Sequence, residues 1–172
     1  PMPVLVICPT TVVFNWESEI QKFAPTLTTL KLAGVERKQF FKEIPNYDVV
    51  ITSYALVRRD INKLKEYNFR YVILDESQNI KNAMSQTAQA VKKLQASHKL
   101  ALSGTPIENK LEELWSVFDF LMPGFLFSMA EFNSRYVNPI MERQDKTVEK
   151  RLKLQIYPFI LRRMKRDVAK DL

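Results

Sequence analysis

The sequence predicts an α/β fold in which a three-layer parallel sheet is followed by a helical extension. In the first hundred or so residues, short β-branched or apolar runs alternate with longer stretches of helical spacing, and no strand-like run follows Leu102. Stretches of that length can form the crossover helices that parallel strands require. The runs lack polar alternation, which is typical of strands covered on both faces.

Five runs are expected to be strands, and apolar residues three or four apart predict helices between them. The first helix follows Thr10 and Thr11, which are candidate N-terminal caps. The expected strands are Val4–Cys8, Leu27–Leu32, Asp48–Thr52, Tyr71–Leu74 and Lys99–Leu102. The residues that mark the helices are Val13, Trp16, Ile20 and Phe23, then Ile61 and Leu64, then Ala90, Val91 and Leu94 within Ala83–Leu94.

After Pro106 the alternation of strand-like and helical segments gives way to helical segments alone. Leu111–Leu121 is strongly amphipathic, and Pro123-Gly124 ends it. Ala130–Val137 and Thr147–Val168 are predicted as further helices, with Pro158 bending or interrupting the second. We therefore expect a sheet domain over residues 1–122 and a helical extension over residues 123–172.

The formal net charge of +7 is unevenly distributed, because Arg143–Leu172 holds ten basic and four acidic residues. Such a tail can meet nucleic-acid phosphates, or it can be a solvated amphipathic helix. A single cysteine, Cys8, excludes an intramolecular disulfide framework, and Cys8 with His98 cannot build a zinc site alone. No apolar run reaches the roughly 18 residues needed to span a bilayer, so we expect an intracellular protein without a membrane partner.

An acidic pair, Asp75-Glu76, directly follows the expected strand Tyr71–Leu74. Ligands of open parallel sheets lie beyond the carboxyl ends of the strands. A carboxylate placed there suits Mg²⁺, and Mg²⁺ bridges nucleotide phosphates. The neighbouring Glu76 could orient or deprotonate an attacking water. The alternative is an ordinary solvated turn.

Three further polar loops should share this edge. Ser103-Gly104-Thr105-Pro106 follows the last strand, 28 residues after Asp75, and its hydroxyls could bond the acidic loop. Thr52-Ser53-Tyr54 and Cys8-Pro9-Thr10-Thr11 could bind phosphates of a nucleic-acid backbone. Each loop could instead be a simple turn or helix cap. Four polar loops on one edge favour a functional site.

The motifs VLVICPTTVVFNW, DVVITSY, VILDESQNIKN, LALSGTPIEN, LWSVFDFL and PFILRR occur in this order across the whole chain. As a set they resemble the Swi/Snf-type ATPases, a branch of the superfamily-two helicase-like DNA translocases, and QNIKN is similar to bacterial members. The resemblance implies a RecA-like first motor lobe and the start of the helical protrusion. It also implies ATP, Mg²⁺, double-stranded DNA, a second RecA-like lobe of the same parent chain and a possible DNA-bound protein target.

The resemblance also implies roles for single residues. Asp75 matches the Mg²⁺-handling acid and Glu76 the catalytic base, while Gln78 of the same catalytic motif stands where many members carry His. The motif that couples nucleotide state to DNA contacts is matched by Ser103, Gly104 and Thr105. Residues that match DNA-side motifs are Thr10, Asn15, Trp16, Thr52 and Ser53, and the basic pair at the lobe junction is Arg162 and Arg163.

The chain has no phosphate-binding loop, because none of Gly34, Gly104 and Gly124 is followed by Lys-Ser or Lys-Thr. In the family this loop lies just upstream of the segment that matches Val4–Cys8, so we expect a fragment or remnant. Alone it should bind ATP and Mg²⁺ weakly and hydrolyse ATP negligibly. The parent would be cytoplasmic and nucleoid-associated in a bacterium, or nuclear in a eukaryote. A non-catalytic DNA-binding or scaffolding module is the alternative, and a restriction translocase subunit is disfavoured by LSGTPIEN and PFILRR.

Overall fold

The computed structural model describes residues 2–108 and 110–161. The chain divides into two compact units, Pro1–Leu126 and Phe127–Leu172. The boundary predicted near Pro123 lies in the segment that joins helix α4 (Leu111–Leu121) to helix α5 (Met129–Phe132). Each unit has its own buried apolar residues, and each is described separately below.

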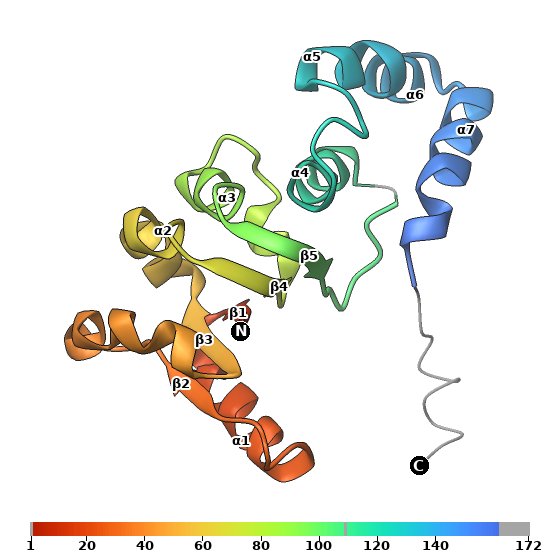
Figure 1. Cartoon of the computed structure of the whole chain (residues 1–172). Coiled ribbons are helices and arrows are strands. Elements are labelled where there is room, and N and C mark those ends of the chain that lie inside the picture. Colours follow the sequence, from red (N-terminus) through yellow and green to blue (C-terminus); the bar gives the residue numbers. More distant parts are fainter. Residues whose placement is uncertain (1, 109, 162–172) are drawn as a thin grey trace. The chain divides into compact units, whose positions relative to one another are not determined.

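The first unit is built on a five-stranded, entirely parallel sheet with the order β2-β3-β1-β4-β5 (Figure 1). The α/β prediction is therefore confirmed. Strands β4 and β5 begin three and four residues earlier than predicted, because polar residues such as Asn68, Arg70, Gln95 and Ser97 interrupt the apolar pattern at their starts. The strands are β1 (Val4–Cys8), β2 (Thr29–Lys31), β3 (Val49–Ser53), β4 (Asn68–Leu74) and β5 (Gln95–Ala101).

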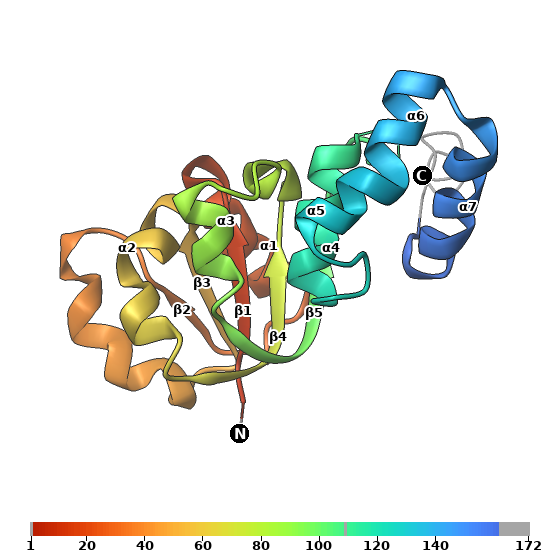
Figure 2. The same cartoon turned by 90° about the horizontal axis from the view of Figure 1, so that it is seen from above.

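Helices cover both faces of the sheet, which gives three layers (Figure 2). Leu5 and Ile7 of β1 pack in one cluster with residues of α2 (Tyr54–Leu64), α3 (Gln86–Val91), α4 and the 3₁₀ segment η2 (Val35–Asn46). The alternate residues Val6 and Cys8 pack on the other face, against α1 (Val13–Phe23). Alternation along β1 therefore buries both of its faces.

The helices differ from the predicted ones at their ends. Thr10 and Thr11 are not caps, because they lie in a 3₁₀ turn, Thr10–Val12, and α1 begins without a side-chain cap hydrogen bond. Phe23 at the end of α1 is 72% exposed, so it does not join the inner face. Helix α3 is shorter than the predicted Ala83–Leu94, because Ser85 caps it by accepting a hydrogen bond from the Ala88 N–H.

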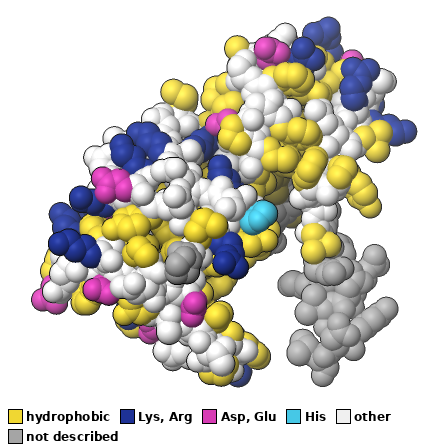
Figure 3. Space-filling model, viewed as in Figure 1, with side chains coloured by type: hydrophobic (Ala, Val, Ile, Leu, Met, Phe, Trp, Pro, Cys, Tyr) yellow, Lys and Arg dark blue, Asp and Glu magenta, His cyan; other side chains and the backbone are white. Residues whose placement is uncertain are grey.

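The face that α1 covers over β1 and β3 stays partly open over β4 and β5. The register pairs Val6 with Ile73 and Ile73 with Leu100, so all three side chains point to the α1 face. On this face Tyr71, Leu100 and Leu102 are between 36% and 43% exposed. Figure 3 shows hydrophobic side chains gathered on the surface of the molecule among scattered basic ones.

The second unit is helical. After α5 come a π-helical segment (Asn133–Val137), α6 (Asn138–Arg143), α7 (Lys146–Ile156) and a 3₁₀ turn (Tyr157–Phe159). The helix predicted over Thr147–Val168 ends at Ile156, because Pro158 cannot continue it. Among the described residues, none of the helices is both long enough and apolar enough to cross a membrane.

Candidate functional site

The carboxyl ends of β3, β1, β4 and β5 lie side by side, so the four predicted polar loops meet at one edge of the sheet (Figure 1). Backbone hydrogen bonds join the loops that follow the strands. The Asp75 N–H donates to Ile7 O at 2.8 Å, and the Ser77 N–H donates to Leu102 O at 2.9 Å. The acidic loop is thereby fixed to the ends of both neighbouring strands.

The carboxylate of Asp75 is held by two donors. Its Oδ1 accepts the Glu76 backbone N–H at 2.9 Å, and its Oδ2 accepts the indole Nε1–H of Trp16 at 2.8 Å. The side chain therefore has one orientation, directed by α1 on one side and by its own loop on the other.

Tyr54, the first residue of α2, contacts the backbone of the acidic loop through its hydroxyl. Its hydroxyl donates to Asp75 O at 2.5 Å and lies 3.4 Å from Glu76 O. Burial, followed by the nearby Asp75 charge, raises the pKa of Tyr54, so the phenol stays a donor at neutral pH. We did not single out Tyr54 from the sequence, although it ends the polar loop Thr52-Ser53-Tyr54.

Glu76 occupies the left-handed backbone region, with φ of 51°. This conformation costs a non-glycine residue on the order of 1 kcal/mol. It turns the chain sharply between β4 and the short 3₁₀ turn Ser77–Ile80. The Glu76 carboxylate Oε2 accepts the Gln78 amide Nε2–H at 2.6 Å. The Glu76 carboxylate is thus tied to Gln78.

Gln78 links the acidic loop to the loop after β5. The Ser103 hydroxyl donates to Gln78 Oε1 at 3.4 Å, so Ser103 bonds the acidic loop as expected. Thr105 bonds Ser103 instead, with their hydroxyl oxygens 3.3 Å apart. A Cβ on Gly104 would meet nothing within 4 Å, so packing gives no reason for glycine there.

The residues that match DNA-side motifs differ in exposure. Thr10 and Asn15 are exposed, whereas Trp16 is half-buried and its indole N–H is used by Asp75. Thr52 and Ser53 are buried; Thr52 donates to Leu32 O at 3.2 Å, and Ser53 caps α2. Ser53 therefore has the helix-cap role that the sequence left open, and DNA contact by either side chain stays a prediction. Arg162 and Arg163 lie outside the described residues.

The acidic loop fits a magnesium ion that is held mainly by waters and phosphates. Within residues 2–108 and 110–161, no three His, Cys, Asp or Glu side chains converge on a metal-sized site. Mg²⁺ is commonly bound through one or two carboxylates together with substrate phosphates, rather than by an all-protein cage. Asp75 can supply one such carboxylate.

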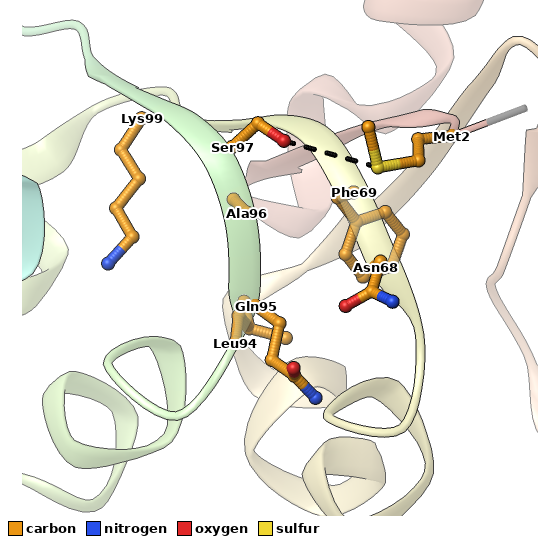
Figure 4. Close-up of a pocket in the computed structure, with 8 residues that line it drawn as sticks. All are labelled: Met2, Asn68, Phe69, Leu94, Gln95, Ala96, Ser97 and Lys99. Atoms are coloured by element: carbon orange, nitrogen blue, oxygen red, sulfur yellow. Dashed lines mark hydrogen bonds between the residues drawn. The ribbon is translucent and has the colours of Figure 1, made fainter.

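A separate cavity of about 370 Å³ lies at the amino ends of β4 and β5 (Figure 4). Met2, Asn68, Phe69 and Ser97 are among its lining residues, and Ser97 Oγ lies 4.0 Å from Met2 Sδ. The acidic loop follows Leu74, at the opposite end of the same strand. Ligands of parallel sheets bind at carboxyl ends, so this cavity is not the candidate site.

Cys8 at the end of β1 is fully buried, and we expect its thiol to resist alkylation in the folded chain. Burial, and secondarily the Asp75 charge, raises the Cys8 pKa from 9.0 to about 12. The folded state therefore keeps the proton that the unfolded state loses above pH 9. This contribution to stability is present below pH 9 and is lost as the pH rises toward 12.

Cys8 is the only cysteine, so iodoacetamide labelling at pH 8 with and without urea measures its protection. Wild type and Cys8→Ala should also be compared by urea unfolding between pH 8 and 10.5. As the pH rises, the free energy of unfolding of wild type should fall relative to that of Cys8→Ala. A pH-independent difference, or equal labelling rates with and without urea, would contradict the prediction.

Solved structures with the same arrangement are known. The Sulfolobus solfataricus SWI2/SNF2 ATPase core in complex with dsDNA superimposes with a TM-score of 0.90 and 45% sequence identity, covering 98% of this chain and 35% of that one. The same core domain in a second structure gives a TM-score of 0.82 at 43% identity. At these identities the similarity extends beyond the RecA-like fold to the sequence.

Sequence relatives come from bacteria and eukaryotes. The Bacillus subtilis protein YwqA is 45% identical over 168 residues, which are 96% of this chain and 18% of that protein. Human TATA-binding protein-associated factor 172 is 41% identical over 187 residues, covering all of this chain and 10% of that protein. These identities are similar, so they do not assign the chain to the bacterial branch. The chain spans only a small part of each relative.

The model of the SNF2-related domain matches residues 1–172, the entire chain. The parallel sheet of this chain is the fold that the sequence predicted. The chain therefore belongs to the SNF2-related domain family.

Proposed function

We propose that this chain is part of the first motor lobe of an ATP-dependent double-stranded-DNA translocase or remodelling ATPase. The observation that carries the proposal is the joined pair of loops at the carboxyl edge, in which Glu76 is bonded to Gln78 and Gln78 to Ser103. A conformational change of the acidic loop during ATP hydrolysis would therefore displace the loop after β5 through Gln78. A motor needs such a connection to couple hydrolysis to movement.

The residues of the acidic loop divide the chemistry between them. Mg²⁺ bound with ATP would neutralise charge that develops on the phosphates. Asp75 would hold that ion directly or through water. Glu76 accepts a proton from the water whose oxygen bonds to the γ-phosphorus while the phosphoanhydride bond to ADP breaks. Gln78 orients the Glu76 carboxylate, because its amide donates to Oε2 at 2.6 Å.

Double-stranded DNA is the proposed track. Support comes from the Sulfolobus structure, which was solved in complex with dsDNA. Thr10 and Asn15 are exposed near the start of α1, where a phosphate backbone can reach them. An upstream phosphate-binding loop and the proposed second RecA-like lobe of the parent chain would complete the nucleotide site. A DNA-bound protein is the proposed target, and the compartment would be the nucleoid or the nucleus.

The test is ATP hydrolysis by the full-length protein with and without duplex DNA. We expect DNA to stimulate turnover, and we expect the 172-residue chain alone to show no turnover above its Glu76→Gln variant. DNA binding without any DNA-stimulated hydrolysis by the full-length protein would instead support a scaffolding module. Clear turnover by the chain alone would contradict the expectation that it lacks half of the nucleotide site.

The basic segment Arg143–Leu172 should make DNA affinity depend on salt. On duplex DNA, log K should fall by about 0.9 per unit of log salt for each phosphate neutralised. Within α7, Lys146 and Lys153 pair with Glu149, and their hydrogen bonds lower the Glu149 pKa. Because Glu149 already neutralises part of the charge of those two lysines, Lys150 and Arg151 are the better candidates for contacts with DNA phosphates.

Fluorescence anisotropy with a labelled duplex at several salt concentrations measures the slope. Lys150→Gln with Arg151→Gln should flatten it by up to about two phosphate equivalents, that is, about 1.8. Glu142→Gln, a change on the exposed part of α6, is the matched control. A slope that the double variant leaves unchanged would place the DNA contacts elsewhere.

A further inference from the structure

Trp16 connects α1 to the acidic loop across 59 residues of sequence. Its indole Nε1–H donates to Asp75 Oδ2 at 2.8 Å, while Asp75 Oδ1 is held by its own loop. The indole is the only one of these two donors that comes from another element. It therefore fixes the Asp75 side chain relative to α1 and to the sheet face beneath α1.

The position of the indole is set by packing that does not involve Asp75. Trp16 packs against the cluster formed by Val6, Cys8, Val13, Val49 and Ile51 on the α1 face. This cluster is almost fully buried, and a packed interior holds side chains in single rotamers. The donor is therefore already oriented before any ligand arrives at Asp75.

We propose that Trp16 is a positioning residue that holds Asp75 ready for the divalent cation. The inference rests on the proposed role of Asp75 toward Mg²⁺.

A purely structural role is the alternative, since a half-buried indole N–H normally finds an acceptor. The two roles differ in what Trp16→Phe should do. Phenylalanine keeps most of the apolar contact with the cluster and removes only the donor. A structural role predicts a small loss of stability with no effect on metal binding. A positioning role predicts weaker metal binding, and partners that orient a ligand are typically worth 10–100-fold in affinity.

Mn²⁺ is the probe, because it prefers the same oxygen ligands and free Mn²⁺ is counted directly by electron paramagnetic resonance. The 172-residue chain is titrated as wild type, Trp16→Phe, Asp75→Ala and Trp115→Phe. Trp115→Phe is the matched control, since it removes the other indole, which lies on α4. We expect equal binding by wild type and Trp115→Phe, and about tenfold weaker binding by Trp16→Phe.

Fluorescence gives a second readout that leaves Trp16 in place. In Trp115→Phe the emission comes from Trp16 alone, because the chain has two tryptophans. Adding Asp75→Ala should shift this emission without metal, and Mn²⁺ should change it only when Asp75 is present. Urea unfolding midpoints of all variants check that each one folds.

The outcomes separate the inference from the proposed function. Binding that Asp75→Ala weakens and Trp16→Phe does not would overturn the inference and leave the metal role of Asp75 standing. An emission that does not respond to Asp75→Ala would also overturn it. No Mn²⁺ binding, or binding that Asp75→Ala leaves unchanged, would overturn both the inference and the metal role of Asp75. The motor function is tested independently, by DNA-stimulated hydrolysis in the full-length protein.

Discussion

Replacing Asp60 by alanine should lower the free energy of unfolding by about 3–5 kcal/mol, the usual loss when one partner of a buried ion pair is removed. Asp60 on α2 is 5% exposed and its partner Arg37, in the 3₁₀ segment, is 7% exposed. The Arg37 guanidinium donates from Nε to Oδ2 at 2.6 Å and from a terminal nitrogen to Oδ1 at 2.8 Å. A third donor reaches Gly34 O at 2.9 Å.

The large effect follows from what the substitution leaves behind. The hydrogen bonds from Arg37 to Asp60 raise the Arg37 pKa, so the guanidinium stays charged while it is buried. Without Asp60 this charge is desolvated and keeps only the Gly34 carbonyl. Moving the side chain into water would pull the 3₁₀ segment, together with its own Phe41 and Ile44, out of the main core cluster.

Urea unfolding followed by far-ultraviolet circular dichroism measures the loss. Arg59→Ala is the matched control, because Arg59 is an exposed charged residue next to Asp60 on α2, and its effect should stay within about 0.5 kcal/mol. Replacing both partners, as Arg37→Met with Asp60→Leu, should recover most of the stability. Equal midpoints for Asp60→Ala and Arg59→Ala would show that the pair does not hold the segment.

The sheet was predictable because each strand carries a local apolar signal. Val4–Cys8 was predicted with the observed bounds, since all five of its residues are apolar. Strand β5 was predicted only over its end, because Gln95, Ser97 and His98 are polar on an edge strand that solvent reaches. The 3₁₀ segment Val35–Asn46 was not predicted, because it depends on contacts such as Arg37 with Asp60, which no local pattern reveals.

The candidate site was predictable to the level of loops rather than of contacts. Parallel pairing alone brings Asp75 and Ser103 to one edge, and their connection through Gln78 follows from loop length and turn geometry. The bond from Trp16 to Asp75 depends on how α1 crosses the sheet, and it joins residues 59 apart. The support from Tyr54 depends likewise on where α2 begins. Such contacts require the packed structure.

Glu76→Gln should lower DNA-stimulated ATP turnover by the full-length protein by about 10²–10⁴-fold, the usual contribution of a general base. The substitution keeps the size and shape of the side chain. Its amide oxygen can still accept the Gln78 amide hydrogen bond, which the carboxylate accepts at 2.6 Å. Both residues face the same cost at a φ of 51°, so the fold of the loop should not change. Only the ability to take a proton from water is lost.

Steady-state phosphate release at saturating ATP and DNA measures the effect. The urea midpoint of unfolding should stay within a few tenths of a molar of the wild-type midpoint, because the free energy of unfolding should change by no more than about 0.5 kcal/mol. Glu112→Gln, an exposed glutamate on α4, controls for the loss of one negative charge. Gln78→Ala should have a smaller effect, because it frees the Glu76 carboxylate without removing it. If Glu76→Gln and Gln78→Ala reduced turnover equally, Glu76 would act by orienting water through its hydrogen bonds, and proton acceptance would belong to another group.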